Sequence, residues 1–109
     1  MATISNIVID QGTTFNLELN LTNDDNSAKN LADYTVTSQM RKSYEATTAT
    51  DFTTAKVDAT GKITISLTAV QTAALKSGRY VYDIEIASSA ETLRVLEGLV
   101  TVTPNVTRA

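Results

Sequence analysis

Hydrophobic and polar residues alternate in several separate stretches of this chain. In the clearest stretch, residues 15–22, Phe15, Leu17, Leu19 and Leu21 alternate with asparagine, glutamate and threonine. A period of two over this length predicts a strand with one buried face. Apolar alternation or short apolar runs predict further strands near residues 4–9, 34–41, 52–57, 63–67, 80–86 and 92–103.

The last of these stretches changes phase along its length. Leu93 and Val95 fall on one parity, whereas Leu96, Val100 and Val102 fall on the other. One inserted residue exchanges the two faces of a strand. The sequence therefore predicts a β-bulge between residues 95 and 98.

Residues 68–76 depart from the strand pattern. Thr68 and Gln71 have the spacing of a helix capping box, and Val70, Ala74 and Leu75 have helical spacing behind it. Ser-Gly follows at residues 77–78 and favours a stop. We expect one short helical turn that bridges two strands at the end of the fold.

The spacing of these elements predicts the fold class. About seven short strands, with turn residues every eight to twelve positions, are typical of a two-sheet sandwich. The length of 109 residues fits one domain. We therefore expect a single all-β, immunoglobulin-like sandwich over residues 1–109, with one short helical turn near 68–76 and a polar C-terminal tail at 104–109.

Composition narrows the function. The chain has no cysteine and no histidine, so a disulfide framework, a thiol nucleophile and the usual general base are all missing. Its 19 threonines favour strands and turns. Nine basic residues are spread over a chain of net charge -3, which argues against nucleic acid, and no apolar run is long enough to span a membrane. We expect no catalytic residues, no metal, no cofactor and no enzymatic activity.

Two acidic groups have a functional and a structural interpretation. Asp24 and Asp25 supply oxygen atoms that suit calcium, but the loop lacks the ligand spacing of a dedicated site, so turn formation is the favoured interpretation. Asp83 and Glu85 lie two apart on one strand face, which resembles an acid/base pair. Without a histidine or a metal signature, a solvated face is favoured.

Arg41 and Asp83 have outward parity on strands that are neighbours in such a sandwich. We therefore expect a cross-strand ion pair between them, with a structural role. Tyr44 lies in the polar loop of residues 43–51, where it is either an exposed anchor for a partner or a ring that folds back on the sandwich.

Longer segments of the sequence resemble a known family. The resemblance is carried by Ile-Asp-Gln-Gly-Thr-Thr-Phe at 9–15, Met-Arg-Lys-Ser at 40–43, Gly-Arg-Tyr-Val-Tyr-Asp-Ile-Glu at 78–85 and Glu-Gly-Leu-Val-Thr-Val-Thr-Pro at 97–104. The chain is similar to the small immunoglobulin-like domains of tailed-phage virions, especially the N-terminal domain of upper-baseplate proteins. Members of that family are structural modules without known chemistry.

The resemblance implies a virion protein that is made in the bacterial cytoplasm and assembled in several symmetric copies. Its partners would be other proteins of the tail, baseplate, neck or capsid. The tail and baseplate are the expected location. Because the chain ends at Ala109 without a fibre or receptor-binding domain, decoration of the neck or capsid stays open as an alternative.

Surfaces rather than chemistry would then carry the function. The candidate interface residues are Tyr44 in the loop and Pro104, Val106 and Arg108 in the C-terminal tail. A carbohydrate-binding adhesion module is a further alternative, although sugar platforms need exposed aromatic residues and the chain has only four tyrosines and two phenylalanines.

Overall fold

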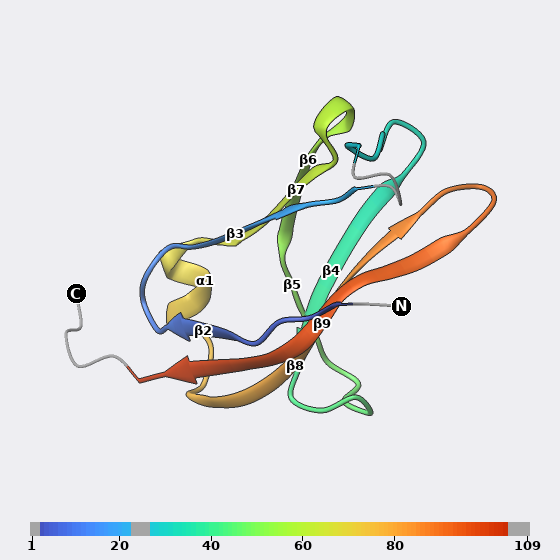
Figure 1. The fold of residues 1–109 in the computed structure, drawn as a ribbon. Coiled ribbons are helices and arrows are strands. Elements are labelled where there is room, and N and C mark those ends of the chain that lie inside the picture. Colours follow the sequence, from blue (N-terminus) through green and yellow to red (C-terminus); the bar gives the residue numbers. More distant parts are fainter. Residues whose placement is uncertain (1–2, 23–26, 105–109) are drawn as a thin grey trace.

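The structure, a computed structural model, describes residues 3–22 and 27–104. Over these residues the chain forms two β-sheets (Figure 1). The larger sheet contains β1 (Thr3–Ile4), β2 (Ile7–Asp10), β4 (Thr35–Arg41), β5 (Thr50–Asp51), β8 (Gly78–Ala87) and β9 (Thr92–Thr103). The smaller sheet contains β3 (Phe15–Asn20), β6 (Thr53–Val57) and β7 (Lys62–Leu67). The predicted all-β, immunoglobulin-like sandwich is confirmed.

The strand inventory is close to the expected one. Seven of the described strands have four or more residues, and β1 and β5 are additional strands of two residues each. The strand predicted near residues 4–9 is divided into β1 and β2. Between β6 and β7 the chain makes a short 3-10 helix, η1 (Asp58–Thr60).

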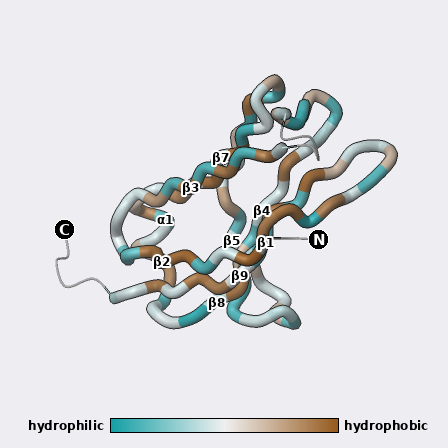
Figure 2. The backbone as a smooth tube through the Cα atoms, viewed as in Figure 1, coloured by the Kyte–Doolittle hydropathy of each residue, from teal (hydrophilic) through white to brown (hydrophobic). Residues whose placement is uncertain are grey.

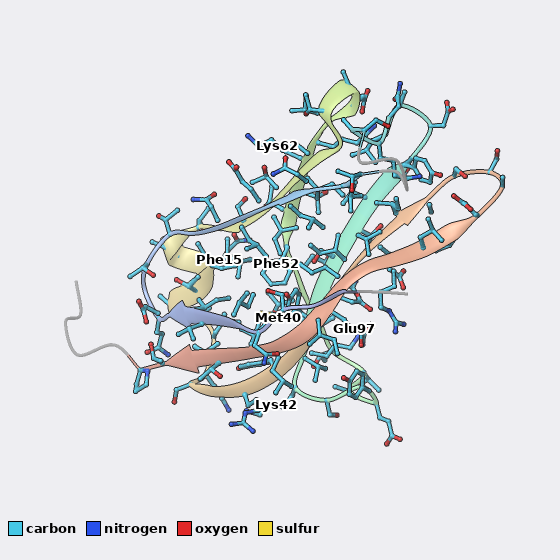
Figure 3. The ribbon with its side chains drawn as sticks, viewed as in Figure 1. Phe15, Met40, Lys42, Phe52, Lys62 and Glu97 are labelled. Carbon is cyan, nitrogen blue, oxygen red and sulfur yellow. The ribbon has the colours of Figure 1, made fainter. Side chains whose placement is uncertain are left out.

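The core lies between the two sheets. Hydrophobic and hydrophilic residues alternate along the strands (Figure 2), which places apolar side chains on the inner face of each sheet. The chain passes from one sheet to the other at Phe52, whose N–H donates to the Ser38 carbonyl at 3.0 Å. The Phe52 ring lies between the sheets (Figure 3), 5.9 Å from the ring of Phe15 and 6.4 Å from that of Tyr82. These rings join the inner faces into one core.

The short helix α1 (Ala69–Ala73) has the predicted cap. The Thr68 side chain accepts from the Gln71 N–H at 3.2 Å, and the Gln71 side chain accepts from the Thr68 N–H at 2.8 Å. Of the apolar residues with helical spacing, Leu75 is buried in the core and Val70 is not. Val70 is 81% exposed, whereas Thr72 is fully buried. Helical spacing alone favoured the valine, but the β2–β3 turn packs on the opposite side and hydrogen-bonds to Thr72.

The predicted bulge is present in β9. Leu96 pairs with Ile84 and Arg94 pairs with Glu85, which leaves Val95 as the extra residue. The bulge lets the inward positions change parity while β9 stays paired with β8. It also keeps Arg94 on the outer face of the larger sheet, beside Glu85.

Both strands at the N-terminal end pair with β9 in parallel. Two hydrogen bonds hold the residues between them: Leu99 N–H donates to Asn6 Oδ1 at 3.0 Å, and Tyr82 Oη donates to Ser5 O at 2.5 Å. The Ser5 carbonyl also packs against Gly98, where any side chain would collide with it. The first strand therefore belongs wholly to the larger sheet. The smaller sheet is left with three strands, and β3 forms one of its edges.

Candidate functional site

A polar groove lies on the outer face of the larger sheet. It has a volume of about 300 Å³ and is formed by β4, β8, β9 and the loop that follows β4. Gln39, Asp83 and Glu97 form one row across its floor, because Gln39 pairs with Asp83 and Asp83 pairs with Glu97. Figure 3 shows where Glu97 lies on β9. We call this region the polar groove.

The ionic partner of Asp83 differs from the predicted one. Its carboxylate lies 3.3 Å from Arg94 Nε, and Arg94 Nη1 lies 3.7 Å from Glu97. Arg41 is on the neighbouring strand, as expected, but it pairs with Val81, which lies two residues before Asp83 on β8. The Arg41–Asp83 ion pair is therefore replaced by an Arg94–Asp83 pair.

Arg41 instead holds the loop that follows β4. Its Nη1 donates to the Ala46 carbonyl at 2.6 Å, and its Nη2 donates to Gln39 Oε1 at 3.1 Å. Ala46 N–H donates to the Ser43 carbonyl at 3.1 Å, which closes a turn around Tyr44. The arginine thus has a structural role, directed at the loop rather than at Asp83.

Tyr44 lines the polar groove and is 79% exposed. The ring is therefore not folded back on the sandwich, and the interpretation as an anchor for a partner stays a prediction. An exposed aromatic ring beside arginine side chains is the composition found at the centre of protein interfaces.

The environment of Asp83 disfavours its charge. Burial raises the pKa of the Asp83 carboxyl, the neighbouring charges of Glu85 and Glu97 raise it further, and the cations Arg94 and Arg41 lower it. The net direction is upward. Among the charged residues that line the groove, the carboxylates of Asp83, Glu85 and Glu97 outnumber the cations of Arg41 and Arg94.

Replacement of Asp83 by asparagine is expected to raise the free energy of unfolding at pH 7. The folded chain holds the Asp83 proton to higher pH than the unfolded chain, so stability is lost as pH rises from the unfolded pKa through the folded pKa. Asparagine cannot ionise and avoids this loss. Because the side chain is 35% exposed, water screens the effect and the gain stays below about 1 kcal/mol.

Urea denaturation of both proteins between pH 3 and pH 7 measures this difference. The two stabilities should converge at the acid end, where Asp83 is protonated, and diverge toward neutral pH. Glu85→Gln serves as a second variant, because removal of that neighbouring charge lowers the pKa of Asp83. A gap between Asp83→Asn and the parent protein that does not change with pH would contradict this account.

A second surface feature is the free edge of β3. Its core-facing residues Phe15, Leu17 and Leu19 are only partly buried, whereas Ile63 and Ile65 on the neighbouring strand β7 are fully buried. The difference arises because, among the described strands, β3 has a neighbour on one side only. This edge was not singled out by the alternation in the sequence, which is the same for edge and central strands.

The remaining sequence candidates are placed as follows. Pro104 is exposed at the end of β9. Val106 and Arg108 lie outside the described residues, as do Asp24 and Asp25. In the described part of the chain, no group of three or more acidic residues is arranged to hold a metal ion. None of the helices described there is long and apolar enough to cross a membrane.

Arg94 and Glu97 are groove residues that the sequence analysis did not select. A signal for Arg94 was present, since counting back from the turn at residues 88–91 pairs Ala87 with Thr92 and then Glu85 with Arg94. The bulge that follows shifts the register, so that Glu97 pairs with Asp83. The Glu85–Arg94 pairing follows from the position of the turn, whereas the Asp83–Glu97 pairing depends on the position of the bulge.

Comparison with known proteins gives a fold and no family. No family model matches the chain, and no curated protein matches it. Among solved structures, InlP of Listeria monocytogenes matches with a TM-score of 0.52 and 17% identity, over 94% of this chain and 28% of InlP. A family 123 glycoside hydrolase from Clostridium perfringens matches with a TM-score of 0.45 and 12% identity, over 96% of this chain and 23% of the hydrolase.

This chain therefore spans less than a third of either protein. The likeness to InlP supports the sandwich fold alone, since shared folds carry many unrelated functions.

Proposed function

We propose that this chain is a non-enzymatic structural module of a tailed-phage particle, where it acts in the tail or baseplate as an adaptor between other virion proteins. The sequence resemblance to virion immunoglobulin-like domains supports the class. Several copies would be arranged symmetrically in the particle, which is assembled in the bacterial cytoplasm.

The observation that carries the adaptor role is the exposure of Tyr44 at the polar groove. Tyrosine is enriched at protein interfaces, and here the Arg41 side chain holds the loop that presents the exposed Tyr44 ring beside the groove. The groove floor adds charged hydrogen-bonding groups from Asp83 and Arg94. A partner that covers this face would bury an aromatic ring within a polar rim, as binding sites between proteins commonly do.

Replacement of Tyr44 by alanine is expected to lower incorporation of the protein into particles by about tenfold without changing its thermal stability. The copy number in purified particles, measured by quantitative mass spectrometry, tests this. Val70→Ala is the matched control, because Val70 is equally exposed but lies on α1 and does not line the groove. Absence of the parent protein from purified particles would refute the proposed function itself.

Location within the particle separates the tail or baseplate from the alternative of neck or capsid decoration. Antibody labelling of intact particles, viewed by electron microscopy, decides between them. Label on the tail or baseplate supports the proposed location, and label on the neck or capsid surface supports the alternative.

A carbohydrate-binding adhesion role is the second candidate, favoured by the dimensions of the groove. A cavity of about 300 Å³ is at the small end of ligand pockets, and it combines one exposed aromatic ring, that of Tyr44, with carboxylates and an amide. Glycan-array binding that is lost in both Tyr44→Ala and Asp83→Asn would support this role. Retained particle incorporation of the same variants would then argue against the adaptor role.

A further inference from the structure

The edge of β3 has main-chain groups that no other described strand pairs with. The Leu21 N–H donates to the Gly61 carbonyl at 2.8 Å, directly beyond the last pair of β3 with β7. Hydrogen-bonded and non-hydrogen-bonded positions alternate along an antiparallel pair, so the N–H and C=O groups of Asn16, Glu18 and Asn20 point away from β7. In the part of the chain that the structure describes, nothing pairs with this edge.

The fold leaves room for a strand beside this edge. Constant-type immunoglobulin sandwiches have four strands in the corresponding sheet, the first strand of the chain being one of them. Here β1 and β2 both pair with β9 in the other sheet, so no strand within residues 3–22 and 27–104 fills that fourth position. Edge strands are usually protected from pairing with another chain by charged residues, proline or a covering segment. The β3 strand has one charged residue, Glu18.

We propose that the edge of β3 pairs antiparallel with the β3 edge of a second copy of this chain, around a two-fold axis at Leu17. In this register Asn16 faces Glu18 of the second copy, Leu17 faces Leu17 and Phe15 faces Leu19. The two Asn16–Glu18 pairs exchange the main-chain hydrogen bonds, because these residues carry the outward-pointing groups.

Charge and pairing length select this register over its neighbours. Moving the axis to Glu18 places two carboxylates opposite each other, which is destabilising. Moving it to Leu19 pairs only Glu18 to Asn20 within the bounds of β3, whereas the axis at Leu17 pairs Phe15 to Leu19. With the axis at Leu17 each Glu18 faces a neutral amide and keeps its own cation, since Lys62 Nζ lies 3.3 Å from its carboxylate.

The partial exposure of the β3 side chains also favours a second copy of the chain as the partner. The core-facing side chains of β3 are partly exposed along the open edge, and the second copy would cover them with the same leucine and phenylalanine row. Lys62 lies on the solvent side of the smaller sheet (Figure 3) and stays clear of this row. The two smaller sheets would then continue as one sheet across the axis.

Sedimentation equilibrium of the purified chain tests the proposal, which does not depend on the proposed function because no particle is needed. We expect a monomer–dimer equilibrium with a dissociation constant on the order of 100 μM, since strand pairing buries a small interface. Glu18→Pro removes an outward N–H that β7 does not use and should weaken the dimer at least about tenfold. Glu18→Gln is its matched control, because it removes the charge, keeps the N–H and should leave the dimer largely intact.

A second pair of variants tests the register and does not require proline to be tolerated. Asn16→Lys places a cation opposite Glu18 of the second copy and should tighten the dimer by about three- to tenfold at low salt, less at high salt. Adding Glu18→Lys to Asn16→Lys places like charges opposite each other and should reverse the gain. A monomer at millimolar concentration overturns the proposal. A dimer that is insensitive to both pairs of variants, or one that is lost in Tyr44→Ala, overturns it as well.

Discussion

Gly61→Ala is expected to lower the free energy of unfolding by about 2–4 kcal/mol. Gly61 follows η1 with φ 68° and ψ 21°, a left-handed conformation that costs any other residue about 1–2 kcal/mol. A Cβ at this position would also lie 2.5 Å from the Leu21 carbonyl oxygen and 2.8 Å from that of Lys29. Both are main-chain atoms, so neither can move away as a flexible side chain would.

The cost is large because this turn connects three segments. The Gly61 carbonyl accepts from Leu21 N–H at the end of β3, and Asp58 O accepts from Leu31 N–H at 3.0 Å. Leu31 is fully buried. A shift of the turn would therefore disturb both the β3 end and the core.

Guanidinium denaturation monitored by circular dichroism measures the change. Thr60→Ala is the matched control, because Thr60 is exposed in the same turn and its loss should change stability by less than about 0.5 kcal/mol. A Gly61→Ala protein that is as stable as this control would show that the turn relaxes without cost.

Thr72→Val is expected to lower the free energy of unfolding by about 1–3 kcal/mol, although valine has nearly the same shape. The hydroxyl of this fully buried threonine accepts from the Gly12 N–H at 3.0 Å and donates to the Thr13 carbonyl at 2.7 Å. Valine removes the partner of both main-chain groups, which lie in a partly buried turn, so each loses its hydrogen bond. The pair of bonds holds the turn in which the chain passes from β2 in one sheet to β3 in the other.

Thr72→Ser isolates the hydroxyl from the methyl group. It keeps both hydrogen bonds and loses one buried methyl group, so its cost should be about 1 kcal/mol. Amide hydrogen exchange at Gly12 gives an independent measurement, with faster exchange expected in Thr72→Val than in Thr72→Ser. Equal stability of the two variants would show that the hydroxyl contributes nothing.

Local sequence patterns specified most of the elements. Alternation in Phe15–Leu21 and in Ile63–Leu67 located two strands, the Thr68–Gln71 pair located the helix cap, and the change of phase after Val95 located the bulge. Each of these features depends on residues within a few positions of one another. A single sequence contains that information directly.

Long-range pairing limited the prediction of the site. Arg41 and Asp83 were placed on neighbouring strands with the same outward parity, and both statements hold. Parity does not fix the register between strands, however. In the actual register Asp83 forms its ion pair with Arg94, and Arg41 hydrogen-bonds to the loop that follows β4. Likewise, helical spacing cannot say which side of α1 the β2–β3 turn will cover, so Thr72 rather than Val70 is buried.

The sequence by itself determined an all-β sandwich without disulfides or histidine chemistry, because alternation and composition are local properties of the chain. Only the tertiary structure decided that Tyr44 stands exposed over a charged groove and that β3 is an edge. The physical reason for the second is that an edge strand and a central strand have the same alternation. Here β1 and β2 pair with β9, at the far end of the sequence, so β3 has a single neighbour among the strands of residues 3–22 and 27–104.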